Sequence, residues 1–430
     1  MRRIALSVFS GILTLPLLIG VGGCERGGEA AEAEAPKSSA ASTDGFDEAQ
    51  REVDRQRALP YSGGREIDDD EEGGVDWIKA DRMQPGYTLF SVHMRAMARL
   101  IDERGNVIHT WRDPDGRHWD NIELLPNGDL ITTGADPAPV QGIKDEARYA
   151  MRLTWDGKVV WKKYLFAHHD ITQTPNGDLL TLTFQRRDEP SIHPTIQLRD
   201  DLITRMTMDG EVTQTVSIFD AVRAKPELFP LEKNKPTSMG GRTWIDNFHL
   251  NSVEQMHFEH LFARDPIYEP QNVLICSRHQ DRIAILNMST GELLWAWGRG
   301  ELDGPHDATV LENGHIMVFD NGLVRGYSRV IELDPLTKSI VWQYVDPKRP
   351  EQFYTKSKGS NQRLANGNTL ICNSDNGEIF EVTPEGETVW RYLSTDRIRK
   401  GDGRVLRAAF VRAYRYDREF IDRLIAEHGE

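Results

Sequence analysis

The sequence predicts an all-β protein, a six-bladed β-propeller in which each blade is a four-stranded sheet. One observation is a hairpin signal, Asn-Gly or a similar pair, that recurs before an apolar strand. Another is a unit of two strands joined by a turn that usually contains glycine, the second strand usually ending in tryptophan. These units repeat at intervals near 45–50 residues, a period that is typical of propeller blades.

The recurring hairpin is clearest in residues 304–322, GPHDATVLENGHIMVFDNG, where Asn313-Gly314 separates two alternating runs. A type I′ turn requires positive φ at both central residues, which Asn and Gly tolerate best. The same pattern occurs at five places, residues 126–132, 175–181, 271–277, 312–318 and 365–371. Each copy is expected to lead from the innermost strand of a blade into the second strand.

The second half of the unit occurs six times, in residues 100–111, 153–161, 206–216, 285–297, 331–342 and 381–390, and the third copy lacks the tryptophan. The separation is 50 residues from Trp111 to Trp161, 45 from Trp297 to Trp342 and 48 from Trp342 to Trp390. The 136 residues between Trp161 and Trp297 hold two units and an insertion around 220–244. The tryptophans are expected to lie on outermost strands and to pack between neighbouring blades.

The blade that contains Trp111 has no inner strand before it, because only five copies of the first half are present. Residues 405–416, VLRAAFVRAYRY, are the only β-like run left unassigned. We therefore expect this run to supply the innermost strand of that blade, which would close the ring and remove the exposed sheet edge. Residues 416–430 are expected to form a helix.

Residues 1–24 predict a lipoprotein-type signal peptide, with a basic start, an apolar run and Gly-Gly before Cys24. Cys24 would then be lipidated, and the protein would be held in the periplasm or at the outer membrane. An ordinary signal peptide or an uncleaved anchor is the alternative. Residues 25–75 are rich in Ala, Glu, Gly, Ser and Asp and predict a disordered acidic linker, followed by the propeller over 76–430.

Charge and cysteine content exclude some functions. The formal net charge of −15 argues against a nucleic-acid partner. Cys276 and Cys372 each follow a Leu-Ile pair in a predicted buried strand, so we interpret them as core residues and not as a disulfide. No Cys/His spacing typical of a zinc site occurs.

Three histidines share one register in the predicted inner strands. His169 and His306 each precede the asparagine of the next hairpin by seven residues, and aligning FHLNSV with PHDATV gives His249 the same position. This position would face the central channel, so the three imidazoles are expected to converge. The alternative is that each is a structural residue in a turn. His168, next to His169, is a second candidate for the same place.

Other polar residues are expected to join these histidines. Asn251 lies two residues after His249 and so on the same face of a strand, while Arg278 follows a strand of the same blade. Arg363 begins the last blade, and with Asn251 it is expected to bind substrate. Histidines together with arginines predict an anion site, because guanidinium matches an oxyanion and imidazole can act as nucleophile or acid. A metal site is the competing interpretation, against which the basic surroundings weigh.

These motifs resemble those of the bacterial arylsulfate sulfotransferases, six-bladed propellers of the periplasm. The matching segments are HHDITQTPNGDLL (168–180), DNFHLNSVE (246–254), SRHQDRIAIL (277–286) and PHDATVLENGHIMVFDNG (305–322). The resemblance implies that His306 accepts the sulfuryl group of an aryl sulfate and passes it to a phenol. It also implies sulfate contacts from His249, Asn251 and Arg278, with His169 as the third histidine and no cofactor or nucleotide donor.

The resemblance has departures, and other classes stay open. The well-known members carry an additional amino-terminal β domain linked to dimerisation, which the predicted linker replaces here, so the oligomeric state and the physiological donor and acceptor are not predicted. A non-catalytic envelope propeller, serving as a binding or assembly scaffold, leaves the histidine register unexplained. A quinone-dependent dehydrogenase needs acidic calcium ligands and usually eight blades, which this length cannot hold.

Overall fold

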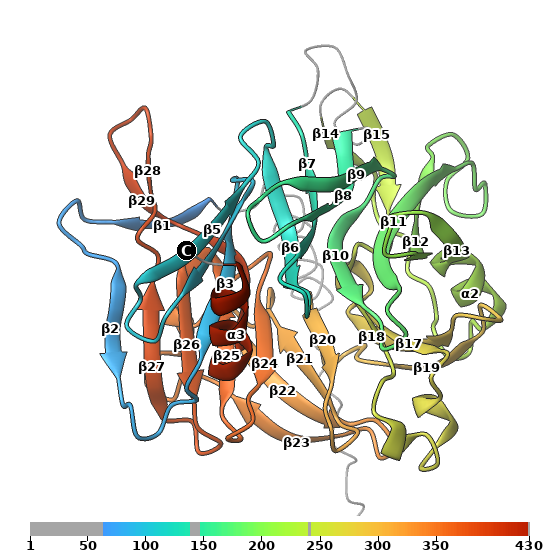
Figure 1. Cartoon of the computed structure of the whole chain (residues 1–430). Helices are drawn as coiled ribbons and strands as arrows, with labels where there is room; N and C mark the ends of the chain where they lie inside the picture. The colour runs from blue at the N-terminus through green and yellow to red at the C-terminus, as the bar shows by residue number, and fades with distance from the viewer. Residues whose placement is uncertain (1–62, 138–146, 240–241, 429–430) are drawn as a thin grey trace, which may run out of the picture. The chain divides into compact units, whose positions relative to one another are not determined.

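The computed structural model describes residues 63–137, 147–239 and 242–428 (Figure 1). The predicted signal peptide, the lipidation site at Cys24 and the linker as far as residue 62 lie outside the described residues. Within the described ranges the chain is almost entirely β, with seven sheets and two α-helices. No helix of this part has the length and apolar character needed to cross a bilayer.

Six of the seven described sheets contain four strands in antiparallel succession, and each of these forms a blade. The first three blades, from innermost to outermost strand, are β30 (Phe410–Tyr416), β3 (Tyr87–Val92), β4 (Met97–Ile101), β5 (Val107–Arg112); β6 (His118–Leu124), β7 (Leu130–Ala135), β8 (Arg148–Leu153), β9 (Val159–Tyr164); and β10 (His168–Gln173), β11 (Leu179–Arg187), β12 (Leu198–Met206), β13 (Val212–Ser217).

The other three blades follow in chain order. They are β16 (Leu250–Gln255), β17 (Asn272–Ser277), β18 (Arg282–Asn287), β19 (Leu293–Trp297); β20 (His306–Val310), β21 (Ile316–Asp320), β22 (Arg329–Asp334), β23 (Ser339–Tyr344); and β24 (Ser360–Arg363), β25 (Thr369–Asn373), β26 (Glu378–Val382), β27 (Thr388–Leu393). The predicted fold class, an all-β propeller of four-stranded blades, is confirmed.

The innermost strands surround a central channel. Each of β30, β6, β10, β16, β20 and β24 contacts the next, and β24 contacts β30. At every junction a side-chain oxygen accepts a hydrogen bond of 2.7–3.0 Å from a backbone N–H of the following strand, the acceptors being Tyr416, Glu123, Asp170, Glu254, Asp307 and Gln362. Polar side chains therefore line the channel partly because they connect the blades.

Apolar layers between adjacent blades form the core. Between the fourth and fifth blades, for example, Leu274 and Ile283 are buried in one cluster with Ile316 and Val318. Full burial of one such side chain contributes about 1.5–3 kcal/mol to folding. The ring is therefore held by apolar packing around a polar channel.

The predicted closing strand divides into two strands with different partners. β30 pairs with β3 and is the innermost strand of the first blade, as expected. The preceding β29 (Val405–Ala408) instead pairs with β1 (Gly64–Ile67) and β28 (Arg397–Arg399) in a separate three-stranded sheet. The side chain of Arg407 in β29 is buried and pairs with Glu71, which ties the amino-terminal segment to this sheet.

The boundary predicted at residue 75 is too late. β1 and the first two residues of β2 (Gly74–Ile78) fall in the predicted linker, yet β2 is a fifth strand at the outer edge of the last blade, where it pairs with β27. Acidic residues of the predicted linker are partners of arginines, Glu71 of Arg407 and Asp69 of Arg399. The described residues from Gly64 onward therefore belong to the propeller domain.

The outer-strand tryptophans connect neighbouring blades, as expected. The indole N–H groups of four of them donate to turn carbonyls of the next blade, in the pairs Trp161–Met208, Trp295–Pro335, Trp342–Pro384 and Trp390–Glu103. In the fourth blade the connecting residue is Trp295 and not Trp297, from which the repeat was measured. The two lie two residues apart on β19 and share a face of the strand, so spacing alone could not separate them.

The insertion and the carboxyl terminus add the remaining elements. The insertion forms α2 (Ile218–Ala224) and a hairpin of β14 (Thr237–Met239) and β15 (Arg242–Asp246), whose last residue reaches the channel histidines. The predicted terminal helix is α3 (Arg418–His428). Cys276 and Cys372 are both buried free thiols, as predicted.

Candidate active site

His306, the first residue of β20, is buried in the channel with 7% of its surface exposed. Its Nδ1 lies 2.8 Å from Oδ1 of Asn321 and 3.1 Å from the carbonyl oxygen of Gly304. Burial, followed by the positive charge of Arg278, lowers the pKa of His306 to about 3. The imidazole is therefore neutral throughout the ordinary pH range, as a nucleophile requires.

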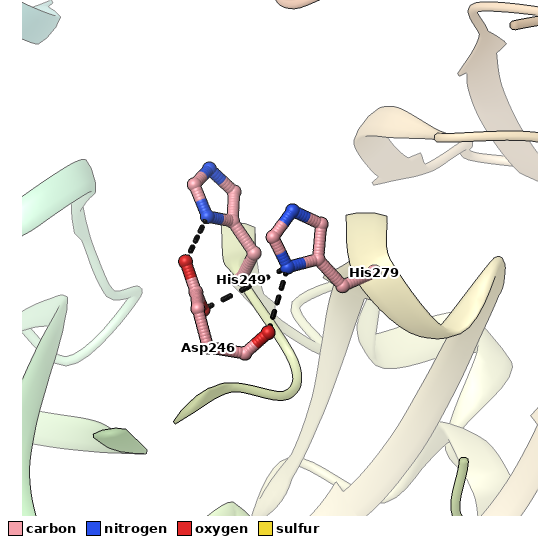
Figure 2. Close-up of side chains that lie close together, drawn as sticks. All are labelled: Asp246, His249 and His279. Atoms are coloured by element: carbon pink, nitrogen blue, oxygen red, sulfur yellow. Dashed lines mark hydrogen bonds and ion pairs between the residues drawn. The ribbon is translucent and has the colours of Figure 1, made fainter. Parts of the chain in front are cut away.

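His249 and His279 lie side by side above Asp246, with one nitrogen of each ring facing that residue and the other directed away (Figure 2). His249 donates from Nδ1 to Oδ2 of Asp246 at 2.6 Å, and His279 donates from Nδ1 to the backbone oxygen of Asp246 at 2.8 Å. Burial raises the pKa of Asp246, but His249, His279 and Arg199 outweigh that effect and hold it well below its usual value. Asp246 is thus an ionised carboxylate that orients His249.

Arg278 connects this cluster to His306. It begins the 3-10 segment η4 (Arg278–Gln280) and is almost fully buried. Its Nη1 donates to Nε2 of His279 at 2.9 Å, and its charge is the largest neighbouring influence on the pKa of His306. The guanidinium therefore lies close enough to act electrostatically on the candidate nucleophile.

A metal ion has to be tested at Asp246, His249 and His279, because one donor atom from each lies within 4.8 Å of the others. The contact of 2.6 Å between His249 and Asp246 is a hydrogen bond, and two ligands about 2.1 Å from one tetrahedral ion would stand roughly 3.4 Å apart. Arg278 also donates a hydrogen bond to Nε2 of His279, which brings a positive charge close to the cluster. As arranged, these residues fit a hydrogen-bonded cluster better than a metal site.

His169 joins the cluster, whereas His168 lies behind it. The rings of His169 and His249 are 4.9 Å apart between centroids. Burial and the nearby charge of His249 lower the pKa of His169 well below its usual value. His168 is fully buried, and its Nε2 lies 3.4 Å from a carboxylate oxygen of Asp201. Of these two candidates the structure brings His169 to the neighbouring histidine.

The shared register predicted for the three histidines holds for two of them. His169 and His249 have left-handed backbone conformations, with φ of 59° and 50°, but in the fifth blade the left-handed residue is Asp307, with φ of 51°. His306 lies one position earlier, as His168 does in its own blade. Pairing between the first and second strands shifts register in all three blades, and counting residues back from the hairpin cannot show these bulges.

The side-chain amide of Asn251 contacts backbone groups close to His306. Its Nδ2 donates to the carbonyl of Pro305 at 2.8 Å, and its Oδ1 accepts from the N–H of Asp307 at 3.3 Å. These are the backbone groups on either side of His306. These contacts support the strand that carries His306, and the substrate contact of Asn251 stays a prediction.

Arg363 is not brought to the histidines. Its guanidinium pairs with Glu332 at 2.7 Å and lies over the ring of Trp342 at 4.9 Å. Both partners belong to outer strands of the neighbouring blade. The sequence placed Arg363 correctly at the innermost strand, but its side chain is used between blades, and its expected role in substrate binding has no support from these contacts.

Several residues of the site were missed by sequence reasoning. Arg412 on β30 is buried in the channel and pairs with Asp170 at 3.2 Å and Asp307 at 3.1 Å. Lys358 is buried and pairs with Asp375 at 2.7 Å. Asn321 and Asp246 lie within the sequence motifs, but no role was predicted for either residue. For Asn321 the Asp-Asn-Gly after an apolar strand was an available signal, since polar residues at strand ends often face a site.

The channel widens into a cavity of about 560 Å³, whose lining comes from all six innermost strands. Asp307, directly after His306, lines it together with Asp170, Glu254 and Arg412. Burial raises the pKa of Asp307 to about 6 and that of Glu254 to about 8. These three carboxyl groups thus line this cavity together with Arg412, whereas Arg278 and His249 are the charged neighbours that act on His306.

The fold and this site define an all-β propeller whose channel holds a neutral histidine beside a guanidinium, a combination suited to an anionic substrate. The arylsulfotransferase (ASST) family model matches residues 121–395, and the chain belongs to that family. Because the chain belongs to this family, the protein is an enzyme of the sulfotransferase type, which carries out aryl sulfotransfer. The matched region contains every candidate site residue named from the sequence except Cys24.

Solved structures resemble this chain only at low sequence identity. A protein of unknown function from Bacteroides caccae is 15% identical, with 72% of this chain and 93% of that chain covered and a TM-score of 0.44. Streptogramin B lyase is 14% identical, covering 84% and 95%, with a TM-score of 0.42. The Cps50 (Swd1) β-propeller domain of Myceliophteria thermophila is 11% identical, covering 77% and 88%, with a TM-score of 0.43. The comparison with curated proteins gives no match.

Proposed function

We propose that this protein transfers a sulfuryl group from an aryl sulfate ester to a phenolic acceptor through a covalent sulfohistidine at His306. The observation that carries the proposal is the state of His306, a buried neutral imidazole whose Nδ1 is engaged by Asn321 and Gly304 while Arg278 lies nearby. A neutral ring beside a cation is suited to attack on an anionic ester. No nucleotide sulfate donor is required by this scheme.

In the first half-reaction the lone pair of Nε2 of His306 forms a bond to sulfur, and the bond between sulfur and the aryl oxygen breaks. The phenolate leaves with that electron pair and takes a proton from the imidazolium of His249. In the second half-reaction neutral His249 takes the proton of the acceptor phenol. The phenol oxygen then bonds to sulfur, and the bond between sulfur and Nε2 breaks. Two transfers of lower barrier replace one.

The charges around His306 suit this chemistry. Sulfuryl transfer, like phosphoryl transfer, spreads negative charge over equatorial oxygens, so positioned cations supply most of the stabilisation. Arg278 is the nearest candidate for that task. Asp246 would stabilise the imidazolium of His249 when it acts as acid, through the hydrogen bond of 2.6 Å.

The direct test is mass spectrometry of the protein incubated with 4-nitrophenyl sulfate and no acceptor. We expect one added sulfuryl group, located on the peptide that contains His306 and lost when a phenol is added. His306→Ala should take up none while keeping the wild-type circular dichroism spectrum. A wild-type protein that never gains sulfuryl from any aryl ester would support the alternative, a non-catalytic envelope propeller that binds or assembles partners.

A further inference from the structure

We propose that Asn321 is a positioning residue that selects the tautomer of His306 and thereby makes Nε2 the nucleophilic nitrogen. The inference rests on the proposed sulfohistidine mechanism and adds to it the group that prepares the nucleophile. Asn321 follows β21 directly and is fully buried. Its Oδ1 lies 2.8 Å from Nδ1 of His306.

Two backbone carbonyls fix the orientation of the Asn321 amide. Its Nδ2 lies 2.7 Å from the oxygen of Thr355 and 2.6 Å from the oxygen of Lys358. Carbonyl oxygens only accept hydrogen bonds, so the NH₂ group must face them. A flipped amide would bring its oxygen against both carbonyls, and it is excluded by this network. Oδ1 is therefore the atom that faces His306.

The orientation of the amide determines the proton position on His306. Oδ1 of Asn321 and the carbonyl of Gly304 are both acceptors, so Nδ1 must carry the proton. A neutral imidazole has a single N–H group, which leaves the lone pair on Nε2. Without Asn321 only the longer contact of 3.1 Å to Gly304 would favour this tautomer.

An amide suits this position better than a carboxylate. A carboxylate would accept the same hydrogen bond, but it would also favour the imidazolium, in which both nitrogens carry protons and neither can attack. During sulfuryl transfer the ring gains positive charge, and the bond from Nδ1–H to Oδ1 becomes stronger. Asn321 would therefore stabilise the sulfohistidine more than the free ring, which favours the transfer step.

The test combines nitrogen NMR of the full chain, labelled with ¹⁵N-histidine, with single-turnover kinetics. The His306 signals are assigned by their loss in His306→Gln. We expect wild-type His306 to be protonated on Nδ1 and not on Nε2 at pH 7. Asn321→Ala should give mixed tautomers and slow sulfuryl uptake from 4-nitrophenyl sulfate by about 10- to 100-fold, the effect of one hydrogen bond to a group that becomes charged.

Asn321→Asp keeps the shape of the side chain and an oxygen that accepts from Nδ1 of His306. This variant replaces Asn321→Ala in the test if the alanine variant fails to fold. It should protect the Nδ1 proton but add a loss of rate as the pH falls, because the carboxylate raises the pKa of His306. The matched control is Asn373→Ala. Asn373 is another fully buried asparagine whose amide donates to a backbone carbonyl, that of Gln352 at 3.2 Å. Its removal should cost stability without changing the His306 signals or the rate.

Wild-type His306 protonated on Nε2, or unchanged signals and rate in Asn321→Ala, would overturn the inference. The NMR readout is independent of turnover, so the two proposals can fail separately. If the Nδ1 tautomer depends on Asn321 in a protein that never takes up sulfuryl, the positioning role stands and the proposed function is refuted. If His306 is sulfurylated but Asn321→Ala changes neither the His306 signals nor the rate, the proposed function stands and the positioning role is refuted.

Discussion

Asp307 lies 3.1 Å from the guanidinium of Arg412, and this contact directs the residue after the proposed nucleophile away from it. Arg412 belongs to the closing strand β30 and also donates to Asp170 and to the backbone oxygen of Asn251. His306 meanwhile faces Asn321 and has no contact with the neighbouring carboxylate. One buried arginine on the closing strand therefore links it to the innermost strands of the third, fourth and fifth blades.

Arg412→Ala should be strongly destabilising, because it leaves Asp170 and Asp307 buried without their cation. Removal of one partner from a buried ion pair costs about 3–5 kcal/mol. The measurement is urea unfolding at pH 7. Lys158→Ala is the control, since Lys158 and Asp156 form a solvent-exposed pair, which contributes little to stability. Equal stabilities of the two variants would show that Arg412 does not hold the channel.

Asp246→Asn should slow both half-reactions, because the amide cannot stabilise the imidazolium of His249 as the carboxylate does. Acid catalysis by a positioned group typically contributes 10²–10⁴-fold. The loss should be small for 4-nitrophenyl sulfate, whose phenolate leaves easily, and large for esters of less acidic phenols. Rates are measured against the pKa of the leaving phenol. The control is Asp129→Asn, which alters a buried carboxylate that pairs with Arg152 in a different blade from Asp246. It should leave the dependence of the rate on the pKa of the leaving phenol unchanged.

The uptake of sulfuryl from 4-nitrophenyl sulfate should stay nearly constant from pH 8 to pH 5. The pKa of His306 is lowered to about 3, so the ring is neutral above that value and loses its lone pair only as the pH approaches it. An unperturbed imidazole with a pKa near 6.5 would retain only about 3% of its neutral form at pH 5. Single-turnover rates by acid quench test this. A fall in the single-turnover rate below about pH 6.5 that is also seen in Asp246→Asn would contradict this prediction.

Arg278→Lys and Arg363→Lys should differ, although the sequence assigned both residues to the anion site. Arg278 lies beside His306, and loss of one such donor typically costs about 10²–10³ in rate. Arg363 pairs with Glu332 and stacks on Trp342, so its replacement should reduce stability and leave the rate near wild type. Turnover and thermal unfolding of both variants are the measurements. A large loss of rate in Arg363→Lys would indicate that Arg363 takes part in the anion site after all.

Cys24→Ser tests the proposed lipid anchor. If Cys24 is lipidated, the variant should either leave the membrane fraction or remain unprocessed, which fractionation and metabolic labelling with palmitate would show. Because Cys24 lies far in sequence from the propeller, sulfuryl uptake by a soluble chain beginning at Gly63 should be unaffected. A wild-type protein that takes up no palmitate label, with membrane fractionation unchanged in Cys24→Ser, would contradict a lipoprotein and favour an uncleaved anchor.

The repeating pattern by itself determined the fold class and most of the blade order. Hairpin turns, alternating apolar residues and tryptophans are local signals, and a propeller blade is a meander of neighbouring strands, so local signals suffice. His169, His249 and His306 were singled out by counting along the repeating inner strands, and Arg278 by its place directly after the second strand of one blade. The buried thiols of Cys276 and Cys372 followed from their strands.

Only the tertiary structure decided what depends on contacts between distant segments. It separated β29 from β30, placed β1 and β2 in the domain, and revealed bulges that move His306 out of the common register. It also turned the side chains of Asn251 and Arg363 toward partners in other blades. Asn321 became important because two carbonyls more than thirty residues away fix its amide, and no local pattern records such a contact.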